Sequence, residues 1–217
     1  TGDYGGLQMP EIYSDGMVLQ RNMPVTVSGT ADAGAEVSLK LEGPFRTVRM
    51  KTVTPSSGKW SMELKPLEAA RDLRLTIESK GKRLEYKDLA AGEVWLCSGQ
   101  SNMAFMLCES DDAGEIQADP DLRIFNMKPK WETKNETWDR EAIRSVQMLD
   151  YYNNAGWEKC DGENVRSFSA VGYHFGRMLR DSLDVPVGLI CNAVGGSATE
   201  SWIDRSTLEL YLPAILN

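Results

Sequence analysis

The chain has 217 residues, 41% of them hydrophobic and 26% charged, which is ordinary for a globular protein with one large or two small domains. Its formal net charge of −8 at pH 7 excludes nucleic acid and anionic membranes as natural partners, because a strongly acidic surface repels both. No apolar run is long enough to cross a bilayer, and the polar, glycine-rich start does not resemble a signal peptide.

The first part of the chain, residues 7–88, reads as short strands separated by turns. Apolar residues alternate along it at Val25 and Val27; at Val37, Leu39 and Leu41; at Trp60, Met62 and Leu64; and at Leu73, Leu75 and Ile77. Evenly spaced strands of this kind predict a small all-β sandwich domain over residues 7–88.

From Leu89 onward, strands alternate with helical segments. Short, nearly continuous apolar runs at residues 94–96, 122–125 and 187–191 are typical of parallel strands covered on both faces. The sequence therefore predicts an α/β domain over residues 89–217, with helices and sheet in three layers.

Two helices are well signalled in this second part. Ser167 is a candidate cap for the first, whose apolar stripe is expected to face the sheet: Phe168, Val171, Phe175, Met178 and Leu179. A final helix is expected to begin near Asp204 and to carry Leu208, Leu212 and Ile215.

Two polar segments, residues 109–121 and 128–165, are weakly periodic and are expected to be long loops over the active-site face. The second contains Trp131, Trp138 and Trp157. Sugar rings stack on exposed aromatic side chains, but packing of a long loop explains these tryptophans equally well.

The four cysteines lack metal-site spacing. Cys97 and Cys191 end apolar runs and are expected to be small buried side chains, whereas Cys108 and Cys160 could form a disulfide. No metal cluster, phosphate loop or dinucleotide fingerprint is present, so we expect neither a metal nor a cofactor.

The most informative feature is a serine on a glycine-containing turn. Ser101 follows the apolar run at residues 93–97 and precedes a second run at residues 104–107, which reads as the start of a helix. A serine on such a strand-to-helix turn exposes its hydroxyl and places its own N–H where an oxyanion is favoured. Alternatively, Ser98, Ser101 and Asn102 only cap the helix.

Three blocks carry a family resemblance. They are YSDGMVLQR at residues 13–21, GEVWLCSGQSNM at residues 92–103 and VPVGLICNAVGGSATESW at residues 185–202. In this order they resemble the sialate O-acetylesterases and related carbohydrate acetylesterases of the SGNH (GDSL-like) hydrolase superfamily. The resemblance implies a three-layer α/β/α hydrolase domain, Ser101 as nucleophile and an exported protein whose signal peptide has been removed, hence a periplasmic or secreted location.

The resemblance also implies an oxyanion hole formed by the N–H of Ser101 and a glycine N–H within Gly195-Gly196. A plain strand-to-helix turn is the alternative reading of these two glycines. Gln100 and Asn102 flank the nucleophile and could orient the turn through side-chain hydrogen bonds.

Two residues follow the glycine pair. Glu200 either lines the cleft or complements a helix dipole. Core packing is the favoured interpretation of Trp202, with cleft lining as its alternative.

The general base is missing from the sequence. The only histidine, His174, lies at the edge of the apolar stripe of its helix, where we do not expect a catalytic base. In the family, the histidine belongs to an Asp-x-x-His block near the C-terminus, preceded by a Gln-Gly-Glu block, and neither occurs here.

The missing blocks give an expectation about the whole chain. We expect the N-terminal portion of a longer esterase, inactive alone, whose incomplete sheet favours self-association. The predicted function is removal of O-acetyl groups from sialic acid or related acetylated glycans through an acyl-serine. The alternative is a non-catalytic carbohydrate-binding or interaction module.

Overall fold

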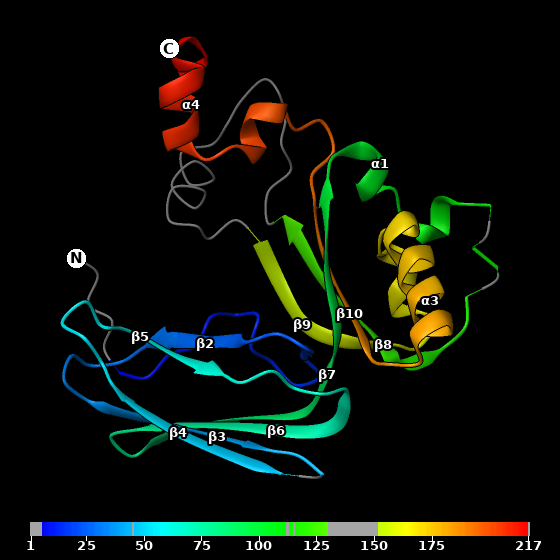
Figure 1. Cartoon of the computed structure of the whole chain (residues 1–217). Coiled ribbons are helices and arrows are strands. Elements are labelled where there is room, and N and C mark those ends of the chain that lie inside the picture. Colours follow the sequence, from blue (N-terminus) through cyan, green and yellow to red (C-terminus); the bar gives the residue numbers. More distant parts are fainter. Residues whose placement is uncertain (1–5, 45, 112, 115, 130–151, 217) are drawn as a thin grey trace.

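The computed structural model describes residues 6–44, 46–111, 113–114, 116–129 and 152–216 (Figure 1). Within them, eight strands form one mixed sheet in the order β4-β3-β6-β7-β10-β8-β9, with β1 beside β7, and β2 and β5 form a second, two-stranded sheet. The first strands are β1 (Val18–Gln20), β2 (Val25–Thr30), β3 (Glu36–Glu42), β4 (Thr47–Val53), β5 (Lys59–Leu64) and β6 (Ala70–Ser79). The others are β7 (Lys82–Gly99), β8 (Asp119–Pro129), β9 (Tyr152–Cys160) and β10 (Val187–Ala193).

The strands expected from alternation in residues 7–88 are confirmed. In β5, for example, Trp60, Met62 and Leu64 are buried while the residues between them are exposed. The β2–β5 pair lies across β4, β3 and β6 (Figure 1), and the two layers share one core that includes Val27 and Leu39. Burial of every second residue explains why this region forms strands rather than helices.

Strand β7 crosses the predicted boundary between residues 88 and 89 without interruption. Its first half is antiparallel to β6, and its second half is parallel to β10. Asp88 sits between the halves with a left-handed φ of 56°. Phe125 and Trp157, from the second part of the chain, pack in the core of the first part. The division into two domains stays a prediction.

The parallel strands expected after Leu89 are confirmed, because β10 lies between β7 and β8 and is parallel to both. The expected loop over residues 128–165 is wrong for its last part, where β9 pairs antiparallel with β8. Register shifts in this pairing and polar residues in β9 obscure the alternation in the sequence. Trp131 and Trp138 lie outside the described residues.

Trp157 is a packing residue rather than an exposed platform for sugars. It is 7% exposed, its ring packs 5.5 Å from that of Phe125, and its indole N–H donates to the Ile12 carbonyl (2.8 Å). Of the two interpretations of this tryptophan, the structure supports packing.

Helix α3 (Ala170–Leu183) confirms the predicted helix but corrects its cap and its buried face. Ser169, not Ser167, is the cap, and its hydroxyl accepts from the Gly172 N–H (3.0 Å). Val171 and Met178 are 52% and 70% exposed, so much of the predicted stripe faces away from the sheet. Gly176 faces the sheet instead, where a β-carbon would come within 2.6 Å of Leu189.

The outward face of α3 continues onto the neighbouring part of β7. Trp95 and Leu96 of β7 are exposed, and the ring of Phe175 meets that of Trp95 edge-on at 5.1 Å. Exposed apolar surface of this kind is often a site of protein association. Self-association through it stays a prediction.

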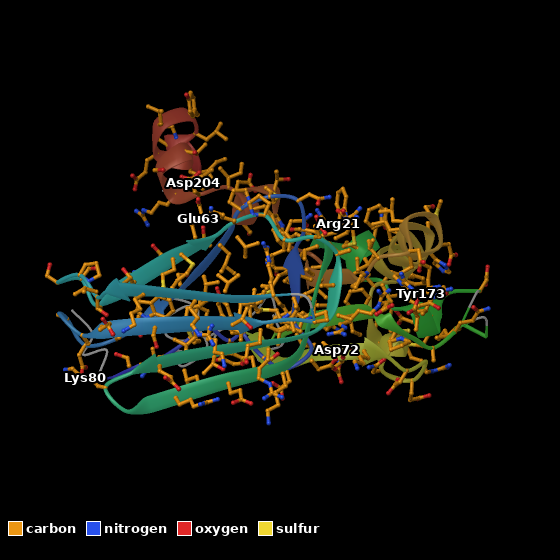
Figure 2. The ribbon with its side chains drawn as sticks, turned by 60° about the horizontal axis from the view of Figure 1, so that its bottom comes forward. Arg21, Glu63, Asp72, Lys80, Tyr173 and Asp204 are labelled. Atoms are coloured by element: carbon orange, nitrogen blue, oxygen red, sulfur yellow. The ribbon has the colours of Figure 1, made fainter. Side chains whose placement is uncertain are left out.

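The last helix, α4 (Arg205–Tyr211), begins where the sequence predicted. The carboxylate of Asp204 caps it by accepting from the Thr207 N–H (3.0 Å). Figure 2 shows Asp204 at this helix. In the same view, Lys80 marks the tip of the β6–β7 hairpin and lies far from Tyr173 on α3. Leu208 is buried, whereas Leu212 and Ile215 are exposed. No helix in the described ranges is long and apolar enough to cross a membrane.

Candidate active site

Ser101 lies at the exposed end of a strand, as the turn chemistry predicted. β7 ends at Gly99, and the short helix α1 (Ser101–Ala104) follows it (Figure 1). Ser101, the first residue of α1, is exposed. Gly99 has a φ of +150°, a conformation that L side chains rarely adopt. The turn therefore depends on a glycine two residues before the serine.

The helix after Ser101 is much shorter than the apolar run at residues 104–107 suggested. α1 ends at Ala104, and a 3₁₀ turn, η1 (Leu107–Glu109), follows. Backbone hydrogen bonds explain the early end, because the Phe105 carbonyl accepts from Ala170 (2.9 Å) and the Leu107 N–H donates to the Phe168 carbonyl (2.9 Å). Residues 104–107 thus pack against the start of α3.

Gly195 lies beside the Ser101 hydroxyl. β10 ends at Ala193, directly opposite Gly99, and the next N–H, that of Val194, donates to the Gly99 carbonyl (3.0 Å). A β-carbon on Gly195 would lie 3.9 Å from Ser101 Oγ. Gly196, with φ of +75°, completes the turn. Two motifs far apart in the sequence therefore meet at one point.

Gln100 and Asn102 flank the serine and are exposed. The Gln100 carbonyl accepts from the Ala104 N–H (2.8 Å), which closes α1. Within the described part of the chain, neither side chain makes a hydrogen bond that would orient the turn, so their expected part in substrate binding stays a prediction.

The segment after the glycine pair is a short 3₁₀ helix, η3 (Thr199–Trp202), with Glu200 half-buried in its first turn. The preference for core packing of Trp202 is wrong, because this side chain is 38% exposed. Its indole N–H donates to Ser197 Oγ (2.9 Å), and Ser197 Oγ donates to the Val194 carbonyl (2.8 Å). Ser197 was not among the predicted site residues, and its only signal in the sequence is its place next to the glycine pair.

Cys97 and Cys191 lie opposite each other on β7 and β10, just before the two site loops. Both are buried, and burial raises the pKa of each thiol, that of Cys191 to about 11. They are therefore inert thiols at neutral pH. Cys108 and Cys160 are also free, so the open question of a disulfide between them is answered in the negative.

The described ranges hold no group of three or more potential metal-ligating side chains of histidine, cysteine, aspartate or glutamate. His174 lies on α3, half-buried, with its ring edge-on to Tyr173 at 5.4 Å. Among the described residues, the Ser101 hydroxyl makes no hydrogen bond to it. This geometry offers an exposed hydroxyl beside a backbone turn, which fits a nucleophile and part of an oxyanion hole, but within the described ranges it brings no histidine to the serine.

Comparison with solved structures gives the class of protein. The fold matches a carbohydrate acetylesterase from Xanthomonas citri, XAC1771, with a TM-score of 0.75 and 27% sequence identity over 96% of this chain and 45% of that one. The family model for "carbohydrate esterase, sialic acid-specific acetylesterase" matches residues 91–216. The chain belongs to this family of carbohydrate esterases.

Curated relatives agree with this assignment. The sialate O-acetylesterase of Pongo abelii is 28% identical over 220 residues, covering 94% of this chain and 40% of that protein. The enzyme of Rattus norvegicus is 29% identical over 221 residues, covering 94% of this chain and 39% of that protein. The chain thus spans about two fifths of the length of these relatives.

Proposed function

We propose that this chain carries the nucleophile half of a carbohydrate O-acetylesterase site, which removes acetyl groups from sialic acid or related acetylated glycans. The observation that carries the proposal is the approach of Gly195 to Ser101 Oγ, with 3.9 Å between that oxygen and a β-carbon built on the glycine. Because Gly195 carries no β-carbon, its backbone stays open toward a group bound at the hydroxyl, as an oxyanion donor requires.

The reaction has two halves. Ser101 Oγ attacks the acetyl carbonyl carbon while a base takes its proton, and the backbone N–H groups of Ser101 and Gly195 bind the oxyanion. The sugar oxygen then leaves with a proton from that base, and an acetyl-serine remains. Water attacks the acetyl-serine by the same route, so acetate is released and the Ser101 hydroxyl is restored.

The base comes, in this proposal, from polypeptide outside the 217 residues. Two observations support this: the relatives are more than twice as long as the part that matches, and the single histidine lies on α3 without a hydrogen bond to Ser101 in the described structure. Without a base the serine hydroxyl stays protonated and is a weak nucleophile. The 217-residue chain alone is then inactive or nearly so.

Fold and location follow from the same proposal. The parallel strands and α3 form part of an SGNH-type layered domain, and residues 7–88 form an accessory β-sandwich. The resemblance to the sialate O-acetylesterases implies export, so the proposal places the protein in the periplasm or outside the cell.

The test compares the 217-residue chain with the product of its complete reading frame on 9-O-acetyl-N-acetylneuraminic acid, following acetate release. The complete product should turn over, its Ser101→Ala variant should not, and the 217-residue chain should be at background. A fully active Ser101→Ala variant would overturn the assignment of the nucleophile. An inactive complete product that still binds the sugar would favour the non-catalytic module.

A further inference from the structure

Trp202 is both exposed and fixed in place. Its side chain is 38% exposed, yet its indole N–H is held by Ser197 Oγ at 2.9 Å. A ring held in this way loses little conformational entropy when a ligand packs on it, so it is preorganised for binding. A tryptophan that served only to fill the core would bury its ring instead.

A short chain of hydrogen bonds joins this ring to the nucleophile turn. Ser197 Oγ donates to the Val194 carbonyl (2.8 Å), and the Val194 N–H donates to the Gly99 carbonyl (3.0 Å), two residues before Ser101. The Ser197 N–H also donates to the Val194 carbonyl (3.3 Å), which closes the turn around Gly195. The ring is therefore anchored to the same turn that contacts the Ser101 hydroxyl.

The other exposed aromatic side chains of the described residues lack this anchor. Phe105, 44% exposed, directly follows α1, but a phenyl ring has no N–H or O–H with which to hold its position. Trp95 meets Phe175 edge-on on the outward side of α3. Tyr211 is 73% exposed on α4, beyond η3. Among the exposed aromatic side chains of the described residues, Trp202 is the one whose ring a hydrogen bond attaches to the glycine turn.

We propose that the face of Trp202 is a stacking platform for the sugar ring of the acetylated glycan, and that Ser197 is the positioning residue that holds the platform. This inference rests on the proposed function, since it places the acetyl group at Ser101. The C–H face of a pyranose packs on an indole ring through apolar contact, and the sugar hydroxyls stay in water. Trp202 thereby selects esters that carry a sugar over small acetyl esters.

The test measures binding, so it does not depend on turnover. The 217-residue chain with Ser101→Ala is titrated with 9-O-acetyl-N-acetylneuraminic acid and followed by saturation-transfer NMR. Adding Trp202→Ala should weaken binding about tenfold and abolish transfer to the sugar-ring protons. Trp202→Phe, which keeps an aromatic face, should lose only about threefold.

Two controls separate the platform from general damage. Ser197→Ala keeps the indole ring but removes the hydrogen bond that holds it, so it should weaken binding of the sugar less than Trp202→Ala does. Tyr211→Ala should leave the affinity for the sugar unchanged. Triacetin, an acetyl ester without a sugar ring, should bind with the same affinity to the chain with Trp202 and to the Trp202→Ala variant.

Two results would overturn the inference. One is an unchanged affinity for the sugar when Trp202→Ala is added and the protein still folds. The other is no binding of the sugar by the folded 217-residue chain that carries Ser101→Ala alone. Ring-dependent binding together with an inactive complete product would instead overturn only the proposed esterase function.

Discussion

Gly195 lies so close to Ser101 that a β-carbon on the glycine would stand 3.9 Å from the serine hydroxyl oxygen. The register of β7 and β10 produces this contact, because Ala193 pairs with Gly99 and the two strands end together. Parallel strands bring the loops at their carboxyl ends to one edge of the sheet, which is where α/β proteins bind ligands.

The two glycines of this site should respond differently to a methyl group. Gly99→Ala forces an L side chain into φ of +150° and brings its β-carbon within 3.3 Å of Met103 Cβ, so the free energy of unfolding should fall by about 1–3 kcal/mol. In Gly195→Ala the new β-carbon lies at ordinary contact distance, so the free energy of unfolding should change by less than about 0.5 kcal/mol. Urea unfolding followed by tryptophan fluorescence measures both, and equal losses would contradict the geometry.

Gly92 is the site of a closer approach, where β7 passes the residue before β10. A β-carbon there would lie 1.9 Å from the Pro186 carbonyl oxygen, so Gly92→Ala should cost about 3 kcal/mol or more, because backbone has to move. Gly114→Ala, with nothing within 4 Å of the added carbon, is the matched control. Thermal unfolding by circular dichroism should show a large fall in Tm for the first variant, and a similar Tm for both would refute the prediction.

Arg123 joins the two halves of the structure from a buried position. Its side chain is 3% exposed, and it donates to the Gly16 carbonyl (2.9 Å) and to the carbonyl and carboxylate of Asp88. Burial lowers the pKa of this guanidinium, but the attraction of Asp88 opposes the shift. Arg123→Met removes the donor from the Gly16 and Asp88 carbonyls, whereas the Asp88 carboxylate keeps Lys159 as a partner (2.7 Å). The free energy of unfolding should fall by about 1–3 kcal/mol, the cost of unsatisfied buried acceptors.

Arg83 provides the control for this experiment. It pairs with Glu85 at 2.8 Å, but its side chain is 57% exposed. Arg83→Met should therefore leave the free energy of unfolding nearly unchanged in the same urea titration. Equal effects of the two substitutions would mean that Arg123 makes no special contribution to the junction between the halves.

The cysteines should react in an order set by burial. In the native protein at pH 8, iodoacetamide should modify Cys108, which is exposed, and spare the three buried thiols at Cys97, Cys160 and Cys191. Mass spectrometry after proteolysis assigns each site, and all four should react in urea. Modification of Cys191 before Cys108 would be inconsistent with the structure.

The same thiols predict a pH dependence of stability. The folded pKa of Cys191 is raised to about 11 from 9.0, so the folded state holds the proton more tightly than the unfolded chain does. The stabilisation is complete below pH 9 and is lost as the pH rises toward 11. The free energy of unfolding of Cys191→Ser, measured at the same pH values, should fall less steeply between pH 9 and pH 11. An equally steep fall in the variant would mean that other groups cause the loss of stability.

Local pattern was sufficient for much of the fold. Alternation at residues such as Trp60 and Met62 identified the strands, and the run before Ser101 identified the strand that carries it, because burial of one face is recorded in neighbouring residues. The pattern found α3 but misplaced its buried face, because the close packing of glycines such as Gly176 leaves no trace in hydrophobic periodicity. The pattern missed β9, whose pairing with β8 is irregular.

The sequence by itself determined most of the elements, though not β9, and it determined which residues are chemically capable. A serine on a glycine turn and a glycine pair are local features. Only the tertiary structure decided that Gly195 reaches Ser101, that Trp202 faces solvent and that Trp157 does not. These relationships depend on strand register and on contacts between residues far apart in the chain, and no local window of sequence records them.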